Sequence, residues 1–126
     1  MVLLSWKVNG LRAAARKGLL EWFGRERPEV LCLQEVRALP EQLGPELREV
    51  PGYRADFHWA ERAGYSGVGT YSRVAPEAVK NGLGAARYDR EGRVLTHDFG
   101  DFLLFNAYFP NGKSSPARLS YKMAFY

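Results

Sequence analysis

A short apolar run that ends in an amide and a carboxylate constrains the fold of this chain most. Pro28 and Glu29 precede the run Val-Leu-Cys-Leu at 30–33, and Gln34 and Glu35 follow it directly. An apolar run of roughly four to eight residues between chain-breaking residues is typical of a buried strand. A strand over 29–33 places Glu35 at the rim of a sheet. There we expect either a metal ion, an arginine or a lysine beside it, or plain solvent around a strand-end glutamate.

The hydrophobic pattern predicts the order β-α-β-α, then a meander of strands and a last helix. Turn residues at 89–92 and 100–101 indicate hairpins. The order predicts one mixed sheet with helices on one face. The predicted strands cover 2–8, 29–33, 53–59, 67–72, 75–80, 93–98 and 101–108, and the predicted helices cover 11–23 with a break at Gly18, 40–50, and a helix that starts at Ser114-Ser115-Pro116.

Size and charge narrow the class of protein. The chain has 126 residues, which we interpret as one domain over 1–126 without an internal boundary. Its net charge of +4 mildly favours a polyanionic partner such as nucleic acid. No apolar stretch is long enough to span a bilayer, so we expect no membrane partner. The single Cys32 cannot form an internal disulfide, which fits a cytoplasmic protein and a small core residue.

Five blocks, in this order, resemble the endonuclease/exonuclease/phosphatase superfamily, and within it the exodeoxyribonuclease III and apurinic/apyrimidinic endonuclease branch. They are the residues 2–13, 31–35, 64–73, 106–112 and 118–122. The resemblance extends over essentially the whole chain. It implies a parent fold with four layers, α/β/β/α, in which two similar halves pack sheet to sheet. This chain would then supply one half of that sandwich.

The resemblance also implies an activity. It points to a metal-dependent DNA phosphodiester hydrolase of DNA repair, which cuts at abasic sites or removes nucleotides from an end with Mg²⁺ or Mn²⁺. Glu35 matches the metal-binding glutamate of the family, and Tyr108 matches its active-site tyrosine. A phenol can hydrogen-bond a phosphate oxygen, or act as a base when it is deprotonated. Asn9 and Asn111 would orient groups at the site, and both are also ordinary turn residues.

Other polar residues are candidates for contact with the DNA backbone. The backbone of a tight loop over 65–67 could approach a phosphate, and scattered arginines and lysines could position the duplex. Glycines in such a loop are more often plain turn residues, and most of the arginines and lysines are expected to be solvated surface charges. His58 and His97 lie in strand patterns and are interpreted as structural. The candidates for substrate contact are Asn9, Arg12, Arg37, Tyr65, Ser66, Gly67, Lys113, Arg118 and Lys122.

Two departures from the family pattern bear on the activity. Lys7 stands where the family has an asparagine at the metal site. An amide oxygen can bind a cation and an ammonium group cannot, so we expect Lys7 to pair with Glu35, or alternatively to turn into solvent. Family members are also about twice as long. Their second half carries a Gly-Asp-x-Asn block and a Ser-Asp-His block, and this chain contains neither.

These departures predict that the chain does not complete the reaction alone. The alternative is a non-catalytic half-nuclease that binds DNA weakly or serves in assembly. We also expect an uncovered sheet face, lined by alternate apolar residues of 67–72 and 101–108. Such a face would need the missing C-terminal half, or a second copy of the chain, to cover it.

Overall fold

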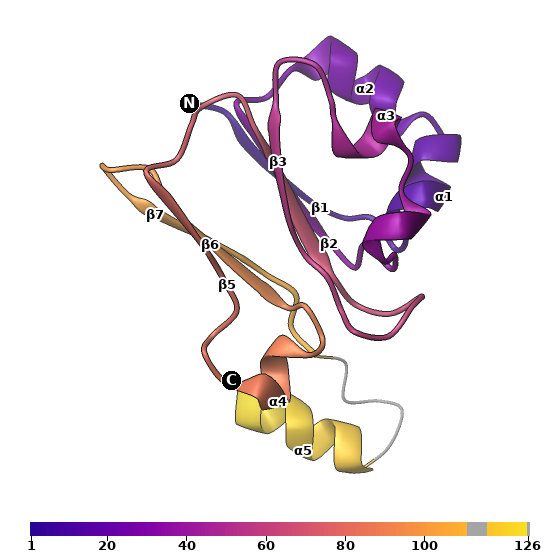
Figure 1. The fold of residues 1–126 in the computed structure, drawn as a ribbon, viewed down its shortest axis with the longest axis vertical. Helices are drawn as coiled ribbons and strands as arrows, with labels where there is room; N and C mark the ends of the chain where they lie inside the picture. The colour runs from indigo at the N-terminus through magenta and orange to yellow at the C-terminus, as the bar shows by residue number, and fades with distance from the viewer. Residues whose placement is uncertain (111–115, 126) are drawn as a thin grey trace.

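The computed structural model describes residues 1–110 and 116–125, and it arranges their strands in two sheets (Figure 1). The first sheet has the order β1-β2-β4-β3, with β1 and β2 parallel and the other pairs antiparallel. The second has the order β5-β6-β7 and is antiparallel throughout. The strands are β1 (Leu3–Lys7), β2 (Val30–Gln34), β3 (Arg54–His58), β4 (Val68–Ser72), β5 (Ala78–Asn81), β6 (Val94–Asp98) and β7 (Leu103–Ala107).

The first three helices cover one face of the four-stranded sheet (Figure 1). They are α1 (Leu11–Arg16), α2 (Leu19–Glu26) and α3 (Pro45–Arg48), and the short 3₁₀ helix η1 (Pro40–Gln42) precedes α3. Gly18 separates α1 from α2 with a φ of 103°, as the sequence predicts. The helix expected over 40–50 is divided, because Pro45 cannot continue a helix and instead starts α3.

The last two helices lie together at the opposite end of the molecule (Figure 1). They are α4 (Ala86–Asp89) and α5 (Pro116–Phe125). The ring of Tyr88 on α4 lies 5.5 Å from the ring centroids of both Tyr121 and Phe125 on α5. The turn expected at 89–92 is therefore only the end of a longer connection that contains α4.

The main core lies between the helices and the four-stranded sheet. Leu11 and Phe23 from the helices and Leu31 and Leu33 from β2 are at most 1% exposed. The alternate residue Cys32 faces the second sheet and is buried too, and this burial raises the pKa of its thiol to about 11. Because β2 is buried on both faces, its sequence is a continuous apolar run.

The second sheet packs on the face of the first sheet that the helices leave free. Asn106 of β7 is buried there, and its amide nitrogen donates to the carbonyl of Gly69 at 2.8 Å and to the hydroxyl of Thr70 at 3.0 Å. Its amide oxygen accepts a hydrogen bond from Gln34 at 2.9 Å. The two sheets are thus tied together by side-chain hydrogen bonds to the backbone and to polar side chains.

The expected α/β class is confirmed, and the four-stranded sheet is mixed with helices on one face as expected, but the strands after Ser72 do not join it. β4 already pairs with β2 and β3 on its two sides, so it offers no edge to the strands that follow it. The chain after Ser72 crosses over and builds its own antiparallel sheet. The chain therefore contributes layers of helices, sheet and sheet, rather than helices and a single sheet.

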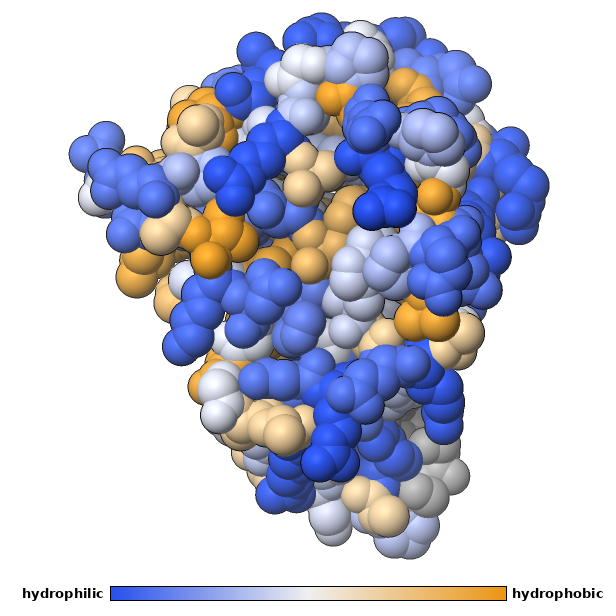
Figure 2. Space-filling view, viewed as in Figure 1, coloured by the Kyte–Doolittle hydropathy of each residue, from blue (hydrophilic) through white to orange (hydrophobic). Residues whose placement is uncertain are grey.

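Exposed apolar residues gather along one side of the molecule. Leu103 and Phe105 of β7 are 57% and 61% exposed, and Met1 and Val2 are also exposed. Figure 2 shows apolar residues along the left edge, over the N-terminus and β7. The expectation for 67–72 is wrong, because β4 is buried between the helices and the second sheet. In the part of the chain that is described, no helix has the length and apolar character needed to cross a membrane.

Candidate active site

The ends of the two sheets meet at a carboxylate and a phenol. Glu35 follows β2 in a left-handed conformation, with a φ of 58°, and is only 7% exposed. Tyr108 follows β7, and its hydroxyl donates a hydrogen bond of 2.6 Å to Oε1 of Glu35. The backbone N–H of Tyr108 donates to the carbonyl of Arg93 at 2.8 Å, which holds the backbone at the end of β7 against the start of β6. The hydrogen bond between Tyr108 and Glu35 thus joins two residues that were separate candidates in the sequence.

Arg37, and not Lys7, forms the ion pair with Glu35. Nη2 of Arg37 lies 3.2 Å from Oε2 of Glu35. Lys7 is exposed, and its Nζ lies 5.9 Å from the centroid of the Tyr108 ring. The expected pairing of Lys7 with Glu35 is therefore wrong. Lys7 lies opposite Gln34 in the strand register, one residue before Glu35, so its side chain runs beside the Tyr108 ring instead.

The protonation of Tyr108 follows from its surroundings. Burial raises the pKa of the Tyr108 phenol, and the hydrogen bond to Glu35 and the charge of Glu35 raise it further, to about 12. At neutral pH the phenol is protonated and donates a hydrogen bond. The geometry therefore favours the role of hydrogen-bond donor or acid over that of a base.

A cavity of about 270 Å³ opens beside this pair. Three arginines and one glutamate line it. Arg37 pairs with Glu35, and Arg93 and Arg118 share the carboxylate of Glu91, so the arginines exceed these carboxylates by one and the cavity favours an anion. The hydroxyl of Ser66 is buried there and has no hydrogen-bond partner among the described residues. The lining residues are Glu35, Arg37, Gly64, Tyr65, Ser66, Arg93, Tyr108 and Arg118.

A second polar cluster supports the far wall of the cavity. Arg93 is 2% exposed, and its guanidinium donates to Glu91 Oε1 at 2.7 Å and to the carbonyl of Tyr108 at 2.9 Å. Arg118 from α5 donates to both carboxylate oxygens of Glu91 at 3.0 Å. Burial alone raises the pKa of Glu91, but hydrogen bonds from Arg118, Arg93 and Tyr65 outweigh it and lower that pKa to about 2.

Glu91 and Arg93 were not among the candidates selected from the sequence. They lie at the end of a turn pattern and at the start of a strand pattern, where charged residues are usually solvated. The only local signal for a buried ion pair is the sequence Glu91-Gly92-Arg93, in which opposite charges stand on either side of a glycine. The buried guanidinium of Arg93 contacts Tyr65 and Tyr108, which lie 28 and 15 positions away along the chain.

The loop predicted over 65–67 is present and is attached to the segment after Glu35. The carbonyls of Ser66 and Gly67 accept hydrogen bonds from Arg37 and Val36 at 2.8 and 2.9 Å. Ser66 and Gly67 have φ values of 50° and 87°. A side chain at Gly67 would be strained and would lie 3.4 Å from Cβ of Val36, so this position suits glycine.

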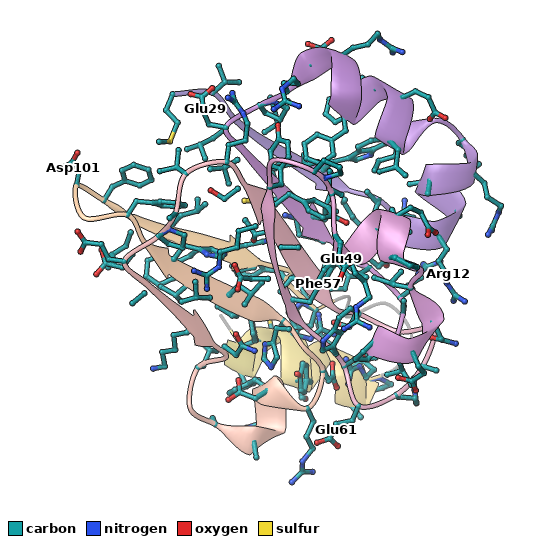
Figure 3. The ribbon with its side chains drawn as sticks, turned by 45° about the horizontal axis from the view of Figure 1, so that its top comes forward. Arg12, Glu29, Glu49, Phe57, Glu61 and Asp101 are labelled. Atoms are coloured by element: carbon teal, nitrogen blue, oxygen red, sulfur yellow. The ribbon has the colours of Figure 1, made fainter. Side chains whose placement is uncertain are left out.

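The remaining candidates lie farther out. Asn9 is exposed in the turn after β1, where the N–H of Gly10 donates to the carbonyl of Glu35 at 2.8 Å. Arg12 donates to the carbonyl of Arg37 at 3.4 Å, and Figure 3 shows it at the periphery of the molecule. Lys122 is half-buried on α5. The candidates that lie outside the described residues are Asn111 and Lys113.

The two histidines lie at the contact between the sheets, as a structural role requires. Nδ1 of His58 lies 3.0 Å from the carbonyl of Val94 in the other sheet. His97 is fully buried and stacks on Phe99 with 6.0 Å between the ring centroids. Neither of them lines the cavity beside Glu35.

The layered sheets define an α/β protein whose candidate site, at the ends of the two sheets, is a cavity lined by three arginines. The chain belongs to the Endonuclease/Exonuclease/phosphatase family, whose pattern matches residues 4–125. It is 39% identical to the DNA repair nuclease APEX1 of Danio rerio over 125 residues, covering 97% of this chain and 40% of that protein. It is 35% identical to an exodeoxyribonuclease of Bacillus subtilis over 124 residues, covering 98% of this chain and 48% of that protein.

Solved structures show the same fold. The catalytic domain of Xenopus laevis APE2 superposes with a TM-score of 0.85 and 28% identity, covering 99% of this chain and 50% of that one. A 3'-5' exonuclease of Neisseria meningitidis superposes with a TM-score of 0.82 and 26% identity, covering 98% of this chain and 48% of that one. The chain thus spans half or less of the length of these relatives.

The resemblance implies a divalent metal ion, and the residues present fit one side of such an ion. Oε2 of Glu35 is buried and has no hydrogen-bond partner among the described residues, because its contact with Arg37 is an ion pair of poor hydrogen-bond geometry. Mg²⁺ takes one or two carboxylates and keeps several waters. The described residues contain no group of three or more histidine, cysteine or acidic side chains placed to enclose a metal.

Proposed function

We propose that this chain forms part of a metal-dependent hydrolase that cuts DNA phosphodiester bonds in repair, as its relatives are named for. The observation that carries the proposal is the Glu35–Tyr108 pair at the edge of the guanidinium-lined cavity. Phosphodiester hydrolysis needs positive charge around the phosphate and a proton donor near its oxygens. Arg37, Arg118 and the protonated Tyr108 supply these groups in one cavity.

The metal would be Mg²⁺ or Mn²⁺, with Glu35 as one oxygen ligand. When bound, it would polarise a phosphoryl oxygen of the substrate. Arg37 already neutralises Glu35 in part, so binding of the ion would compete with that ion pair. Tyr108 would keep its proton and, when Glu35 binds the ion, would turn its single O–H from Glu35 to a phosphate oxygen. Ser66 would supply a further hydrogen-bond donor from the cavity wall.

The partner of this chain is proposed to be the C-terminal half of a family domain, on the same polypeptide or on another. β1 and β7 are the outer strands of their sheets, and a groove of about 310 Å³ runs between them. Exposed apolar residues surround the groove, and they would be covered by further strands. Pairing with a second copy of the chain is the alternative. The site of action would be the cytoplasm.

The experiment compares the chain alone with a chimera that joins it to the C-terminal half of the Bacillus subtilis relative. Each is incubated with a duplex that contains one abasic site, with Mg²⁺, and circular dichroism checks that both proteins are folded. We expect cleavage by the chimera and none by the chain alone. Glu35→Gln in the chimera should abolish cleavage, whereas Glu21→Gln on α2 should not.

Two results would count against the proposal. A folded chimera without cleavage would contradict the hydrolase. Cleavage by the chain alone, at the rate of the chimera, would contradict the need for a second half. The competing function, a non-catalytic module that binds DNA or assembles, is favoured by Lys7, because an ammonium group beside the site opposes a cation. DNA binding by an inactive, folded chimera would support that module.

A further inference from the structure

A second cavity, of about 520 Å³, lies beside the candidate active site. Tyr65 and Arg118 line both cavities, so the two cavities are neighbours. We propose that Arg62 and Arg90, on the rim of the second cavity, bind a backbone phosphate of DNA that flanks the phosphate in the first. This inference rests on the proposed function and extends it to a second contact. The lining residues are Glu61, Arg62, Tyr65, Arg90, Glu91 and Arg118.

The guanidinium of Arg62 is held ready for a ligand. It lies 4.6 Å from the centroid of the Tyr65 ring, while its side chain is exposed. Stacking on a ring restricts the long arginine side chain and leaves its N–H groups free at the edge. A planar fork of this kind matches the paired oxygens of a phosphate.

Tyr65 is a rigid support for this stack. Its hydroxyl donates to Glu91 Oε1 at 2.9 Å and accepts hydrogen bonds from Arg93, at 3.1 Å, and from Arg118. Because these three contacts use the hydroxyl fully, the phenol oxygen is not available to a phosphate. Tyr65 would therefore contribute to substrate binding through its ring, which positions the guanidinium of Arg62.

Arg90 comes from a different loop, and the two loops are locked together. The backbone N–H of Glu61 donates to the carbonyl of Arg90 at 2.8 Å. Gly92 has a φ of 58°, and a Cβ there would lie 2.5 Å from the carbonyl oxygen of His58. Only glycine permits this approach. The loop after β3 and the loop after α4 thus place Arg62 and Arg90 on the same rim.

Charge on this rim favours an anion. Among the described residues, no carboxylate lies within 4.0 Å of the guanidinium of Arg62 or Arg90. The carboxylate of Glu91 is already shared by Arg93 and Arg118. Glu61 is exposed on the rim of the molecule, as Figure 3 shows, and is the one lining carboxylate that would oppose a phosphate.

The test measures DNA binding by the 126-residue chain with EDTA present, so that hydrolysis plays no part. Fluorescence anisotropy follows a labelled duplex with one abasic site over a series of salt concentrations. The variants are Arg62→Gln, Arg90→Gln, the double variant and Glu61→Gln. Arg25→Gln, an equally exposed arginine on α2, is the matched control. Thermal unfolding of each variant reports on folding.

Each phosphate contact contributes about 0.9 to the slope of log K against log salt, which is about 8-fold in affinity at 0.1 M salt. Because the two arginines share one phosphate, we expect the double variant to lose about 8-fold in affinity with a slope lower by about 0.9, and each single variant to lose a smaller part of this. Glu61→Gln should bind more tightly than the unmodified chain. If these side chains had only a structural role, the arginine variants would not weaken DNA binding while Glu61→Gln strengthens it.

Binding by the arginine variants equal to that of Arg25→Gln would overturn the second phosphate contact and leave DNA binding in place. Tighter binding by Glu61→Gln with the expected losses at Arg62 and Arg90 would support it. No binding by the unmodified chain would overturn both this contact and DNA recognition by the chain. A failure of cleavage in the chimera would instead bear on the hydrolase alone.

Discussion

The hydroxyl of Tyr108 donates a 2.6 Å hydrogen bond to the buried carboxylate of Glu35, a residue 73 positions earlier in the chain. The contact joins the ends of β2 and β7, and therefore the two sheets. Because Glu35 also pairs with Arg37, one carboxylate organises a hydrogen-bond donor and a cation at the same point. Four predictions follow from contacts of this kind.

The first prediction concerns the phenol of Tyr108. Glu35→Gln should lower the pKa of Tyr108 from about 12 toward its ordinary value, because it removes a negative charge beside the phenolate. Burial, the largest cause of the shift, remains. Carbon NMR of tyrosines labelled at the ζ position measures this pKa, and Tyr108→Phe assigns the signal. Glu26→Gln on α2 is the control. An unchanged pKa of Tyr108 would show that the contact is not formed in solution.

The second prediction concerns Lys7. Lys7→Asn should tighten the binding of Mn²⁺, because it removes an ammonium group beside Tyr108 and restores an amide oxygen. The gain should be on the order of 1 kcal/mol, since an exposed charge several ångströms from the ion acts through a high dielectric. Isothermal titration calorimetry gives the affinity, with Lys17→Asn as the control. Equal affinities for the Lys7 variant and the control would refute the charge effect.

The third prediction concerns stability in acid. The pKa of Glu91 is lowered from 4.5 to about 2 in the folded chain. A carboxyl group whose pKa is lower in the folded state stabilises the fold at any pH above its pKa in the unfolded state. This stabilisation is lost as the pH falls from 4.5 toward 2. The free energy of unfolding, measured in urea at several pH values, should fall steeply across this range. Glu91→Gln should be less stable at pH 7 and should lose less stability in acid.

Glu46→Gln is the matched control for Glu91, because Glu46 is an exposed glutamate on α3. It should keep the acid dependence of the unmodified chain. If Glu91→Gln showed that same dependence, the carboxylate would not be held between Arg93 and Arg118 in solution.

The fourth prediction concerns the contact between the sheets. Asn106→Ala should lower the free energy of unfolding by about 2 kcal/mol or more, because it removes the buried hydrogen bonds to the carbonyl of Gly69 and the hydroxyl of Thr70. Chemical denaturation measures this loss. Asn81→Ala is the control, since Asn81 is exposed and makes a single 3.4 Å hydrogen bond to Phe57. Its effect should stay within about 0.5 kcal/mol. Equal losses at the two positions would contradict a special role for Asn106.

The sequence alone determined the local features of this protein. The apolar run at 30–33 is buried on both faces, and Gly18 divides the first helical region, as their local patterns predict. Each of these features depends on side chains within a few residues of one another. The family motifs also selected Glu35 and Tyr108, which the fold then brings into contact.

The tertiary structure alone decided which distant groups meet. The strands after Ser72 pair with one another in a second sheet and not with the free edges of β1 or β3, and strand patterns do not reveal pairing. The ion-pair partner of Glu35 is Arg37 and not Lys7, because the strand register places Lys7 opposite Gln34, one residue before Glu35. Arg93 is buried against the carbonyl of Tyr108 and the hydroxyl of Tyr65, which lie 15 and 28 positions away in the chain. The second sheet and the contacts of Arg93 join residues far apart in the chain, and the orientation of Lys7 depends on strand register, none of which periodicity and propensity encode.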